Sequence, residues 1–316
     1  MYAADRRHFL DFEQPLATVW KQLQNTPEDN PLYTQLQQQL LAMRHVATSH
    51  LSAWQTVQLS RHINRPDTLT YLQHITTGFT ELHGDRYVHD DKSIVGGLAT
   101  FNGQTVMFIG HEKGHNLPDR QYRNFGMPHP PGYRKALRLM KLAEKFQKPV
   151  VTFINTPGAY PGVASQLQGG GEAIARAIYE TLQLRIPVIA VITGEGGSGG
   201  ALGIGAGDVL LMQQHTWCSV VSPESCSAIL WHNSTAKEVA AEQLRLTAAH
   251  MLQYGLITGI IPEPTGGAHW DTAQAASHLH QAIAAELEKL SAQSPESRIR
   301  QRIEKYAAIG FWEQKN

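Results

Sequence analysis

The sequence predicts an α/β protein built around a largely parallel β-sheet. Between about residues 81 and 231, short apolar runs alternate with amphipathic stretches of helical spacing. Two of these units, residues 148–162 (KPVVTFINTPGAYPG) and 186–200 (IPVIAVITGEGGSGG), repeat the same order of proline, apolar strand and glycine-rich turn. Successive parallel strands deliver such turns to one edge of the sheet, and in α/β folds that edge is where ligands bind.

The N-terminal quarter of the chain is predicted to be helical. Residues 12–60 combine long-chain helix formers with prolines at likely helix starts and apolar residues three and four positions apart. The turn at residues 65–67 breaks this pattern, and Asp67 or Thr68 is expected to cap the next helix. We therefore expect an N-terminal helical extension over residues 1–75 and a main domain over residues 76–316 that includes the C-terminal helices.

The main domain is predicted to begin with a hairpin, because Asn102-Gly103 separates two strand-like runs. Strands and helices then alternate. The expected strands are residues 149–155, 187–193 and 209–222, and the expected helices are residues 130–146 and 171–184, one beginning at residue 223, and residues 281–290 and 296–310.

Composition excludes several classes of protein. Lys plus Arg and Asp plus Glu both number 27, so no global field recruits nucleic acid or a membrane surface. Two cysteines cannot form a disulfide framework, and the N-terminus lacks the apolar core of a signal peptide, so a cytoplasmic protein is expected. The 16 histidines show no metal-ligand spacing, so no metal is expected on this chain.

Seven glycines lie between Gly194 and Gly205, directly after an apolar strand. Residues 194–199 match the G-x-G-x-x-G dinucleotide fingerprint, but no carboxylate follows about 20 residues later, as that motif requires. Residues 196–200 also match the G-x-S-x-G elbow of α/β-hydrolases. Ser198 would then be the nucleophile, with Asp and His partners drawn from Asp208, Asp271, His215, His232, His250 and His269.

Two further interpretations use the glycines themselves. Consecutive glycines that open a helix present unpaired N–H groups, which can stabilise a developing oxyanion without a side chain in the way. Alternatively, the small residues simply allow close packing against a neighbouring helix. The pattern alone does not separate these two interpretations.

Longer strings in the chain resemble the α subunits of bacterial acetyl-CoA carboxylase carboxyltransferases. They include GDRYVHDDKSIVGG, RNFGMPHPPGYRKALRLMKLAEKF, FINTPGAYPGV, PVIAVITGEGGSGGALGIGAGD and LITGIIPEPTGGAH. The resemblance implies a crotonase-like fold of ββα units in a spiral, with helical extensions at both ends. It also implies carboxyl transfer from carboxybiotin to acetyl-CoA, giving malonyl-CoA for fatty-acid synthesis.

The same resemblance implies partners. The chain would form an α2β2 heterotetramer, active only with a β subunit that alone carries zinc. It would work with a biotin carboxyl carrier protein and an ATP-dependent biotin carboxylase. No nucleic-acid or membrane partner is expected.

Site residues follow from the resemblance, position by position. The biotin ureido group acts as the base, so the protein has to supply oxyanion donors and walls. The expected backbone oxyanion hole is Gly199, Gly200 and Ala201, with Gly196 and Gly197 shaping the approach. The expected substrate-binding residues are Pro157, Gly158, Ala159, Tyr160, Arg123 and Asn124.

The sequence departs from the family pattern near this expected cleft. Asn155 replaces an aspartate, Ser225 replaces a glycine, and residues 166–168 and 170–171 replace a more polar segment. These departures leave open a specialised subunit with another acyl-CoA acceptor, or a scaffold that keeps only the partner interface.

Overall fold

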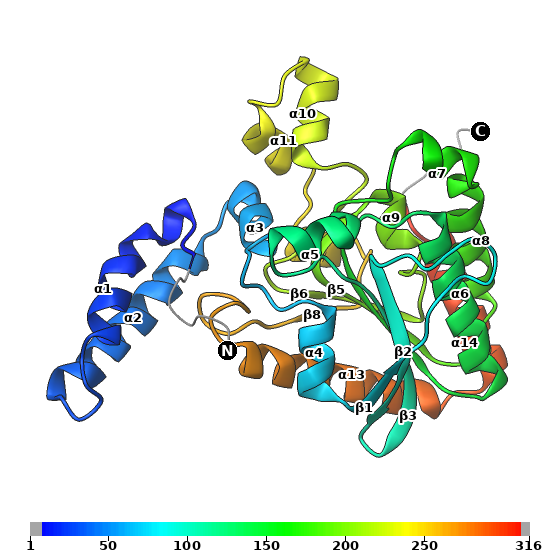
Figure 1. Cartoon of the computed structure of the whole chain (residues 1–316), viewed down its shortest axis with the longest axis horizontal. Helices are drawn as coiled ribbons and strands as arrows, with labels where there is room; N and C mark the ends of the chain where they lie inside the picture. The colour runs from blue at the N-terminus through cyan, green and yellow to red at the C-terminus, as the bar shows by residue number, and fades with distance from the viewer. Residues whose placement is uncertain (1–7, 311–316) are drawn as a thin grey trace, which may run out of the picture.

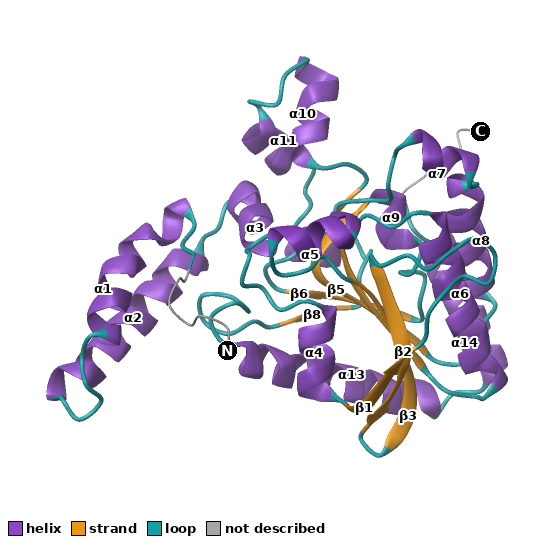
Figure 2. Ribbon diagram, in the orientation of Figure 1, coloured by secondary structure: helices purple, strands orange, loops and turns teal. Residues whose placement is uncertain are grey.

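The computed structural model describes residues 8–310, in which an eight-stranded sheet is covered by helices (Figures 1 and 2). The strand order is β1-β2-β3-β4-β5-β6-β8, and β7 pairs with β5 beside this path. The strands are β1 (Thr77–Glu81), β2 (Ile94–Phe101), β3 (Gln104–His111), β4 (Val150–Thr156), β5 (Val188–Gly197), β6 (Val209–Gln213), β7 (Trp217–Ser219) and β8 (Gly259–Ile261). From β3 onward every pair is parallel, which confirms the predicted sheet type.

The helices account for most of the remaining described chain. They are α1 (Gln14–Gln24), α2 (Pro31–Ser49), α3 (Ala53–Ser60), α4 (Thr68–Ile75), α5 (Leu117–Tyr122), α6 (Pro130–Lys145), α7 (Val163–Leu167), α8 (Gly170–Leu182), α9 (Ser198–Leu202), α10 (Pro223–Trp231), α11 (Lys237–Gln243), α12 (Ala248–Gln253), α13 (Thr272–Ser291) and α14 (Pro295–Ala307). Short 3-10 turns occupy Asp11–Glu13 and Asn124–Gly126.

The central strands β4 and β5 are buried throughout and mostly apolar because helices cover both faces of the sheet. Along β5, Val188, Ala190 and Ile192 join the cluster that includes α6 and α8. The alternate residues Ile189 and Val191 join the cluster on the other face, with α4 and α13. The period of two in a strand thus divides one hydrophobic run between two cores.

The predicted N-terminal helices are present, but they belong to two groups. Helices α1 and α2 bury an apolar cluster of their own and lie at one side of the molecule (Figure 1). Helix α4 instead packs against α13, and the Asp67 side chain accepts a hydrogen bond from the Thr70 N–H, as expected of a cap. The first strand begins at Thr77; the division into two domains stays a prediction.

Two predictions about strands had different outcomes. The hairpin between β2 and β3 is confirmed: Asn102 and Gly103 adopt φ angles of 48° and 76°, which suits a type I′ turn. The single strand predicted over residues 209–222 is wrong, because the chain turns after Gln213. The Thr216 hydroxyl donates to the Gln213 carbonyl at 2.6 Å there. The break places β7 beside residues 195–197, at the very end of β5.

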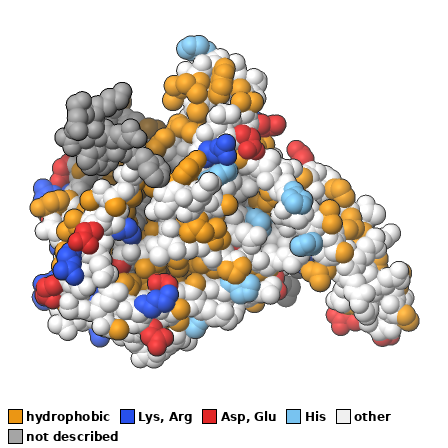
Figure 3. Space-filling model, turned by 180° about the vertical axis from the view of Figure 1, so that it is seen from behind, with side chains coloured by type: hydrophobic (Ala, Val, Ile, Leu, Met, Phe, Trp, Pro, Cys, Tyr) orange, Lys and Arg blue, Asp and Glu red, His pale blue; other side chains and the backbone are white. Residues whose placement is uncertain are grey.

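Helices α10 and α11 project from the body as an arm (Figure 1). Figure 3 shows hydrophobic side chains gathered on this projecting part. The exposed large apolar residues on or beside the arm are Val220, Ile229, Leu230, Trp231 and Val239. Contiguous exposed apolar surface is typical of protein–protein interfaces. Over the described residues, no helix has the length and apolar character needed to cross a membrane.

Candidate functional site

The turns after β4 and β5 meet at the carboxyl edge of the sheet, as the repeated pattern predicted. The two strands run parallel, and Thr156 at the end of β4 lies opposite Gly196 in β5. Helix α9 starts immediately after β5, at Ser198, whose φ of 54° turns the chain sharply from strand into helix. Residues 157–159 and 197–200 therefore face each other.

Close packing between these turns explains two of the glycines. A Cβ atom on Gly197 would overlap the carbonyl of Pro157, and one on Gly200 would lie 2.5 Å from the Ala159 nitrogen. Tyr133 adds a hydrogen bond from its hydroxyl to the Gly200 carbonyl, at 3.3 Å. These glycines let two backbone segments touch, so close packing requires glycine at both positions; their predicted role toward substrate stays a prediction.

Most other glycines between Gly194 and Gly205 are also closely packed. At six of the seven glycines from Gly194 to Gly205, an added Cβ would lie 3.0 Å or less from a neighbouring atom. The neighbours include the Asn155 side chain at Gly194 and the Tyr133 ring at Gly203. Small-residue packing therefore accounts for most of the glycine density.

Gly199 is the exception. Its nearest neighbour, a methyl carbon of Ile174, would lie 3.8 Å from an added Cβ, which is ordinary van der Waals contact. Its φ is not in the left-handed region, so backbone conformation does not require glycine either. Neither packing nor strain explains this glycine, and it is half-buried rather than enclosed.

The first N–H groups of α9 remain available for a ligand. Among the described residues, no hydrogen-bond acceptor is found for the N–H of Gly199 or of Gly200. The first N–H groups of any helix lack intrahelical partners, and here no capping side chain replaces them. Because α9 has only five residues, the individual N–H groups matter more than a helix dipole.

A cavity of about 240 Å³ lies beside this turn. Ala159 lines it, and so does Ile174, the residue nearest to Gly199. Its other lining residues are Pro130, Tyr133, Tyr160, Pro161, Ser165, Gln166, Gly170 and Gly171. Three positions where the sequence departs from the family pattern, Gln166, Gly170 and Gly171, are thus in its wall.

The other predicted substrate-binding residues differ in their position relative to the cavity. Tyr160 lines the cavity and stacks on His129, with ring centroids 4.3 Å apart. Asn124 supports this pair from behind, since its amide lies 3.3 Å from His129 Nε2. Arg123 does not line the cavity; its guanidinium bonds Asp119 at 3.0 Å and the Lys92 carbonyl at 3.1 Å. Its predicted contact with substrate stays a prediction.

A buried ion cluster lies behind the turn, and the sequence interpretation missed it. Glu195, 4% exposed, pairs with the Lys113 ammonium and with Arg61 Nε at 2.6 Å. Burial raises the pKa of Glu195, but the charges of Lys113 and Arg61 outweigh burial, so its pKa is lowered and the carboxylate stays ionised. Arg61 also pairs with Glu224 at the base of α10, so the cluster links strand, helix and arm.

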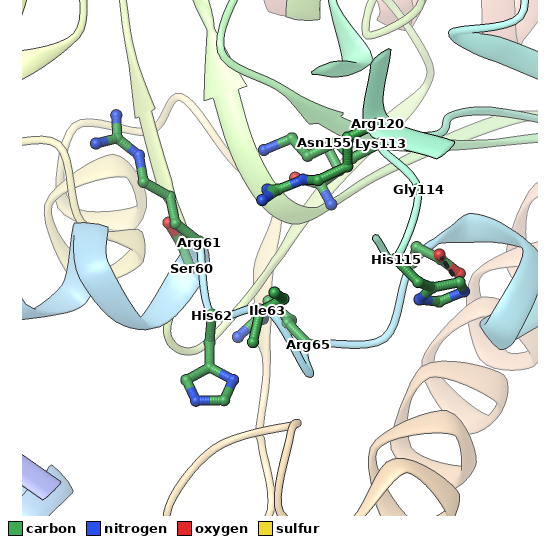
Figure 4. A pocket seen from close by; sticks show the side chains of 11 residues that line it. Ser60, Arg61, His62, Ile63, Arg65, Lys113, Gly114, His115, Arg120 and Asn155 are labelled. Atoms are coloured by element: carbon green, nitrogen blue, oxygen red, sulfur yellow. Dashed lines mark ion pairs between the residues drawn. The ribbon is translucent and has the colours of Figure 1, made fainter. Parts of the chain in front are cut away.

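A small polar cleft opens onto this cluster. Its volume is about 30 Å³, room for about one water molecule. Figure 4 shows Lys113, Arg120 and Asn155 gathered on one side of the cleft, with Arg61 and His115 on the others. The signal available in the sequence was Glu195 itself, a charged residue in a strand whose other residues are all uncharged.

The structure explains why asparagine, rather than aspartate, suits position 155. Its Oδ1 accepts the Glu195 N–H at 3.1 Å and sits against Gly194. A neutral amide makes this contact without placing a second carboxylate next to Glu195. The departure from aspartate therefore removes a like-charge contact in a buried place.

Asp67 lines the cleft, and its carboxyl group is hydrogen-bonded to that of Glu112. Burial and the Asp67 charge raise the pKa of Glu112 to about 8. Burial also opposes ionisation of Asp67, but hydrogen bonds with His115 and Glu112 hold its pKa at about 2. Near pH 7 the pair therefore carries one proton, on Glu112.

The hydrolase alternative is not supported. Ser198 is exposed, and its hydroxyl has no hydrogen-bond partner among residues 8–310. The candidate partners are engaged elsewhere: Asp208 with Arg302 at 2.8 Å, Asp271 as the cap of α13, and His250 with Thr247. The residues needed for a nucleophile, a base and an orienting acid do not come together.

Glu13, His62 and His269 are far apart in the sequence, but their potential metal-ligand atoms lie within 4.8 Å of one another. Their hydrogen bonds are already made within the protein. His269 Nε2 lies 3.0 Å from Glu13 Oε1, and His62 Nε2 lies 3.0 Å from the His8 carbonyl. We assign the cluster a structural role, joining the N-terminal helices to the main body; absence of a metal stays a prediction.

Comparison with known proteins adds sequence relatives. Residues 9–310 match the family model described as acetyl co-enzyme A carboxylase carboxyltransferase-like. A protein of Chlorobium phaeobacteroides named acetyl-coenzyme A carboxylase carboxyl transferase subunit alpha is 48% identical over 96% of this chain and 97% of its own length. Its namesake in Geobacter metallireducens is 49% identical over 94% of this chain and 96% of its own length.

Solved structures show the same fold at low sequence identity. A transcarboxylase 12S structure superposes on 72% of this chain and 42% of its own, with a TM-score of 0.59 and 16% identity. A Pseudomonas malonate decarboxylase hetero-tetramer in complex with coenzyme A superposes on 76% of this chain and 94% of its own, with a TM-score of 0.59 and 14% identity. These likenesses confirm the crotonase-like fold class.

Proposed function

The chain belongs to the acetyl-coenzyme A carboxylase carboxyltransferase α-subunit family, and on that premise we propose that the turn after β5 is its biotin-side oxyanion site. The family makes the chain one part of a biotin-dependent carboxyltransferase. The observation that carries the proposal is the pair of N–H groups on Gly199 and Gly200, which have no acceptor within residues 8–310 and lie beside a cavity.

The cavity suits a flat, largely apolar ring. Most of its wall is proline, glycine, alanine, isoleucine and aromatic side chain, with few polar groups that would need partners. A volume of about 240 Å³ falls just below the roughly 300–1,000 Å³ of complete ligand sites. We infer that this chain forms one wall and that a second subunit closes the site.

The chemistry required of this chain is modest. Carboxybiotin, when bound, supplies the carboxyl group and the base, so no catalytic side chain is needed here. The N–H groups of Gly199 and Gly200 would hold the ureido oxygen as negative charge develops on it, and loss of one such donor typically costs about 3 kcal/mol. Gly199 lacks a side chain so that the ring can approach these donors.

The other predicted residues take supporting roles in this proposal. Pro157, Gly158 and Ala159 hold the turn from the opposite side, and Tyr160 forms part of the ring's wall. Gly197 shapes the turn by packing, and Gly196 packs against β7; Ala201 follows as the third residue of the predicted hole. The departures at Gln166, Gly170 and Gly171 lie on the biotin side, so their position gives no reason to expect a different acyl acceptor.

The exposed arm provides a surface for the partner. Helices α10 and α11 carry apolar side chains outward, and Glu224 at the start of α10 connects the arm to Arg61 and the cluster behind the turn. We propose that a β subunit carrying the zinc covers this arm in an α2β2 assembly. Biotin carboxyl carrier protein and biotin carboxylase complete the cytoplasmic system, and acetyl-CoA is the acceptor.

The test is carboxyl transfer by the purified chain, alone and with its cognate β subunit, measured as malonyl-CoA-dependent carboxylation of biotin. Activity is expected only in the mixture, and Gly199→Ala is expected to reduce it while the complex still forms. A stable, correctly assembled complex without any transfer would refute the proposed activity. Labelling of Ser198 by a fluorophosphonate probe would instead revive the hydrolase interpretation.

A further inference from the structure

A second, larger pocket lies between the β1–β2 loop and the helices α6 and α8. Its volume is about 970 Å³, enough for a cofactor-sized molecule. In Figure 1 this loop crosses the outer side of the two helices. The pocket is lined by four arginines (Arg86, Arg134, Arg138, Arg176), two carboxylates (Asp85, Glu172) and three other side chains (Tyr87, Val88, Leu137).

The loop that forms one wall is held in a fixed shape by Asp85, which is 2% exposed. One of its oxygens accepts the backbone N–H groups of residues 87, 88 and 89, at 2.9, 2.8 and 3.2 Å. The other lies 3.3 Å from Arg134 Nε on α6. Arg86 is held at a φ of 69°, which non-glycine residues rarely adopt, so its side chain is directed by a rigid backbone.

Within the part of the chain that the structure describes, two of the guanidinium groups lack a carboxylate partner. Arg138 bonds only backbone carbonyls, those of Gly84 at 2.9 Å and His83 at 3.1 Å. The side chain of Arg86 makes no hydrogen bond or ion pair with the described residues. Burial and the nearby charge of Arg86 lower the pKa of Arg138 against the opposing charges of Asp90 and Asp85, so the two cations lie within electrostatic reach of each other. An anion between them would relieve this repulsion.

The remaining lining narrows the chemistry of that anion. Guanidinium groups match phosphate oxygens through paired N–H donors. The pocket is far larger than a phosphate ion and contains apolar surface from Leu137 and Val88. Tyr87, 83% exposed, offers a free aromatic face on which a planar base can stack.

We propose that this pocket binds a nucleoside phosphate, with its phosphates between Arg86 and Arg138 and its base against Tyr87. The ligand is either a free adenine nucleotide or the nucleotide end of coenzyme A, which share this chemistry. The inference is independent of the proposed oxyanion site, because it concerns binding to this chain alone.

The experiment is calorimetric titration of the full chain with ADP, coenzyme A, dephospho-coenzyme A and inorganic phosphate. Saturable binding of the nucleotide-containing ligands is expected, with inorganic phosphate at least tenfold weaker. Tighter binding of coenzyme A than of dephospho-coenzyme A and ADP would identify the coenzyme as the source. Equal or tighter binding of ADP would identify a free nucleotide.

Arg86→Ala is the decisive variant, because this exposed side chain supports nothing in the fold. It is expected to weaken ADP binding at least about tenfold, the effect of losing one charge-assisted contact of about 1.4 kcal/mol or more. Arg300→Ala, an exposed arginine on α14, is the matched control and is expected to leave binding unchanged. Absence of saturable nucleotide binding, or equal binding by Arg86→Ala and the parent chain, would overturn the proposal.

Discussion

The last residues of β5 separate two regions of opposite chemistry. On one side, the turn at residues 197–200 is made of backbone atoms and carries no charged side chain. On the other, Glu195 lies in a buried cluster with Lys113 and Arg61. We call the Glu195 cluster the charged side and the turn at residues 197–200 the neutral side. The comparison shows that ion pairs on the charged side anchor the end of β5, so that the neutral side can present its N–H groups in a fixed place.

The largest expected effect is on the charged side. Glu195→Gln removes the buried carboxylate that lies between Lys113 and Arg61, and breaking a buried pair in this way costs about 3–5 kcal/mol of stability. Urea unfolding of the purified chain measures this loss. Glu224→Gln is the matched control, since Glu224 is the more exposed partner of Arg61, and it is expected to cost less than about 1 kcal/mol. Equal losses would show that burial does not distinguish the two pairs.

The next largest effect is expected on the neutral side. Gly200→Ala places a Cβ 2.5 Å from the Ala159 nitrogen, and the backbone at this position has little freedom to move away. Overpacking of this kind is expected to cost about 3 kcal/mol, seen as a lower denaturation midpoint. An alanine variant with unchanged stability would mean that the two turns are not packed as described.

Gly199→Ala is expected to change activity without changing stability, so it separates the catalytic role of this turn from its role in packing. Because an added Cβ has space, the free energy of unfolding is expected to change by less than about 0.5 kcal/mol. The methyl group would occupy the approach to the N–H donors, so kcat/KM of the assembled enzyme is expected to fall about 10- to 100-fold, equal to about 1.4–2.7 kcal/mol. Full activity in this stable variant would remove Gly199 from the proposed site.

The last expected effect is a slope with pH rather than a fixed loss, and it concerns the buried, protonated carboxyl group of Glu112 on the charged side. The pKa of Glu112 is raised to about 8, so between about pH 4.5 and 8 the folded chain keeps a proton that the unfolded chain has released. Stability should therefore fall as pH rises through this range, by up to about 1.4 kcal/mol per pH unit from this group. Asp67, with its pKa near 2, titrates outside the window.

Glu112→Gln tests this pH dependence, because the amide cannot titrate. Urea unfolding at pH 6, 7 and 8 should give a shallower decline for the variant than for the parent chain. The raised pKa of the half-buried His115 comes first from Asp67 and also from Glu112, so the difference reports Glu112 together with its effect on His115. Parallel declines would show that Glu112 is already ionised in the folded chain.

Local patterns in the sequence determined the sheet type, the hairpin at Asn102-Gly103, the cap at Asp67 and the meeting of the two glycine turns. Each depends on neighbours in sequence or on the period of a strand. The strand predicted over residues 209–222 failed because Glu263, 48 residues away from His215, accepts the His215 N–H at 2.9 Å and helps fix the turn there. A contact of that range leaves no trace in a window of adjacent residues.

The sequence by itself determined where the backbone carries no side chain, because the positions of the glycines are fixed by the sequence. Only the tertiary structure decided which glycines serve packing and which one leaves space, because that depends on atoms of residues 157–159 and 174. Likewise, the arginines of the second pocket and the Glu195 cluster come from segments tens of residues apart. Charges act through space, so their pairing, burial and pKa values arise only once folding has brought those segments together.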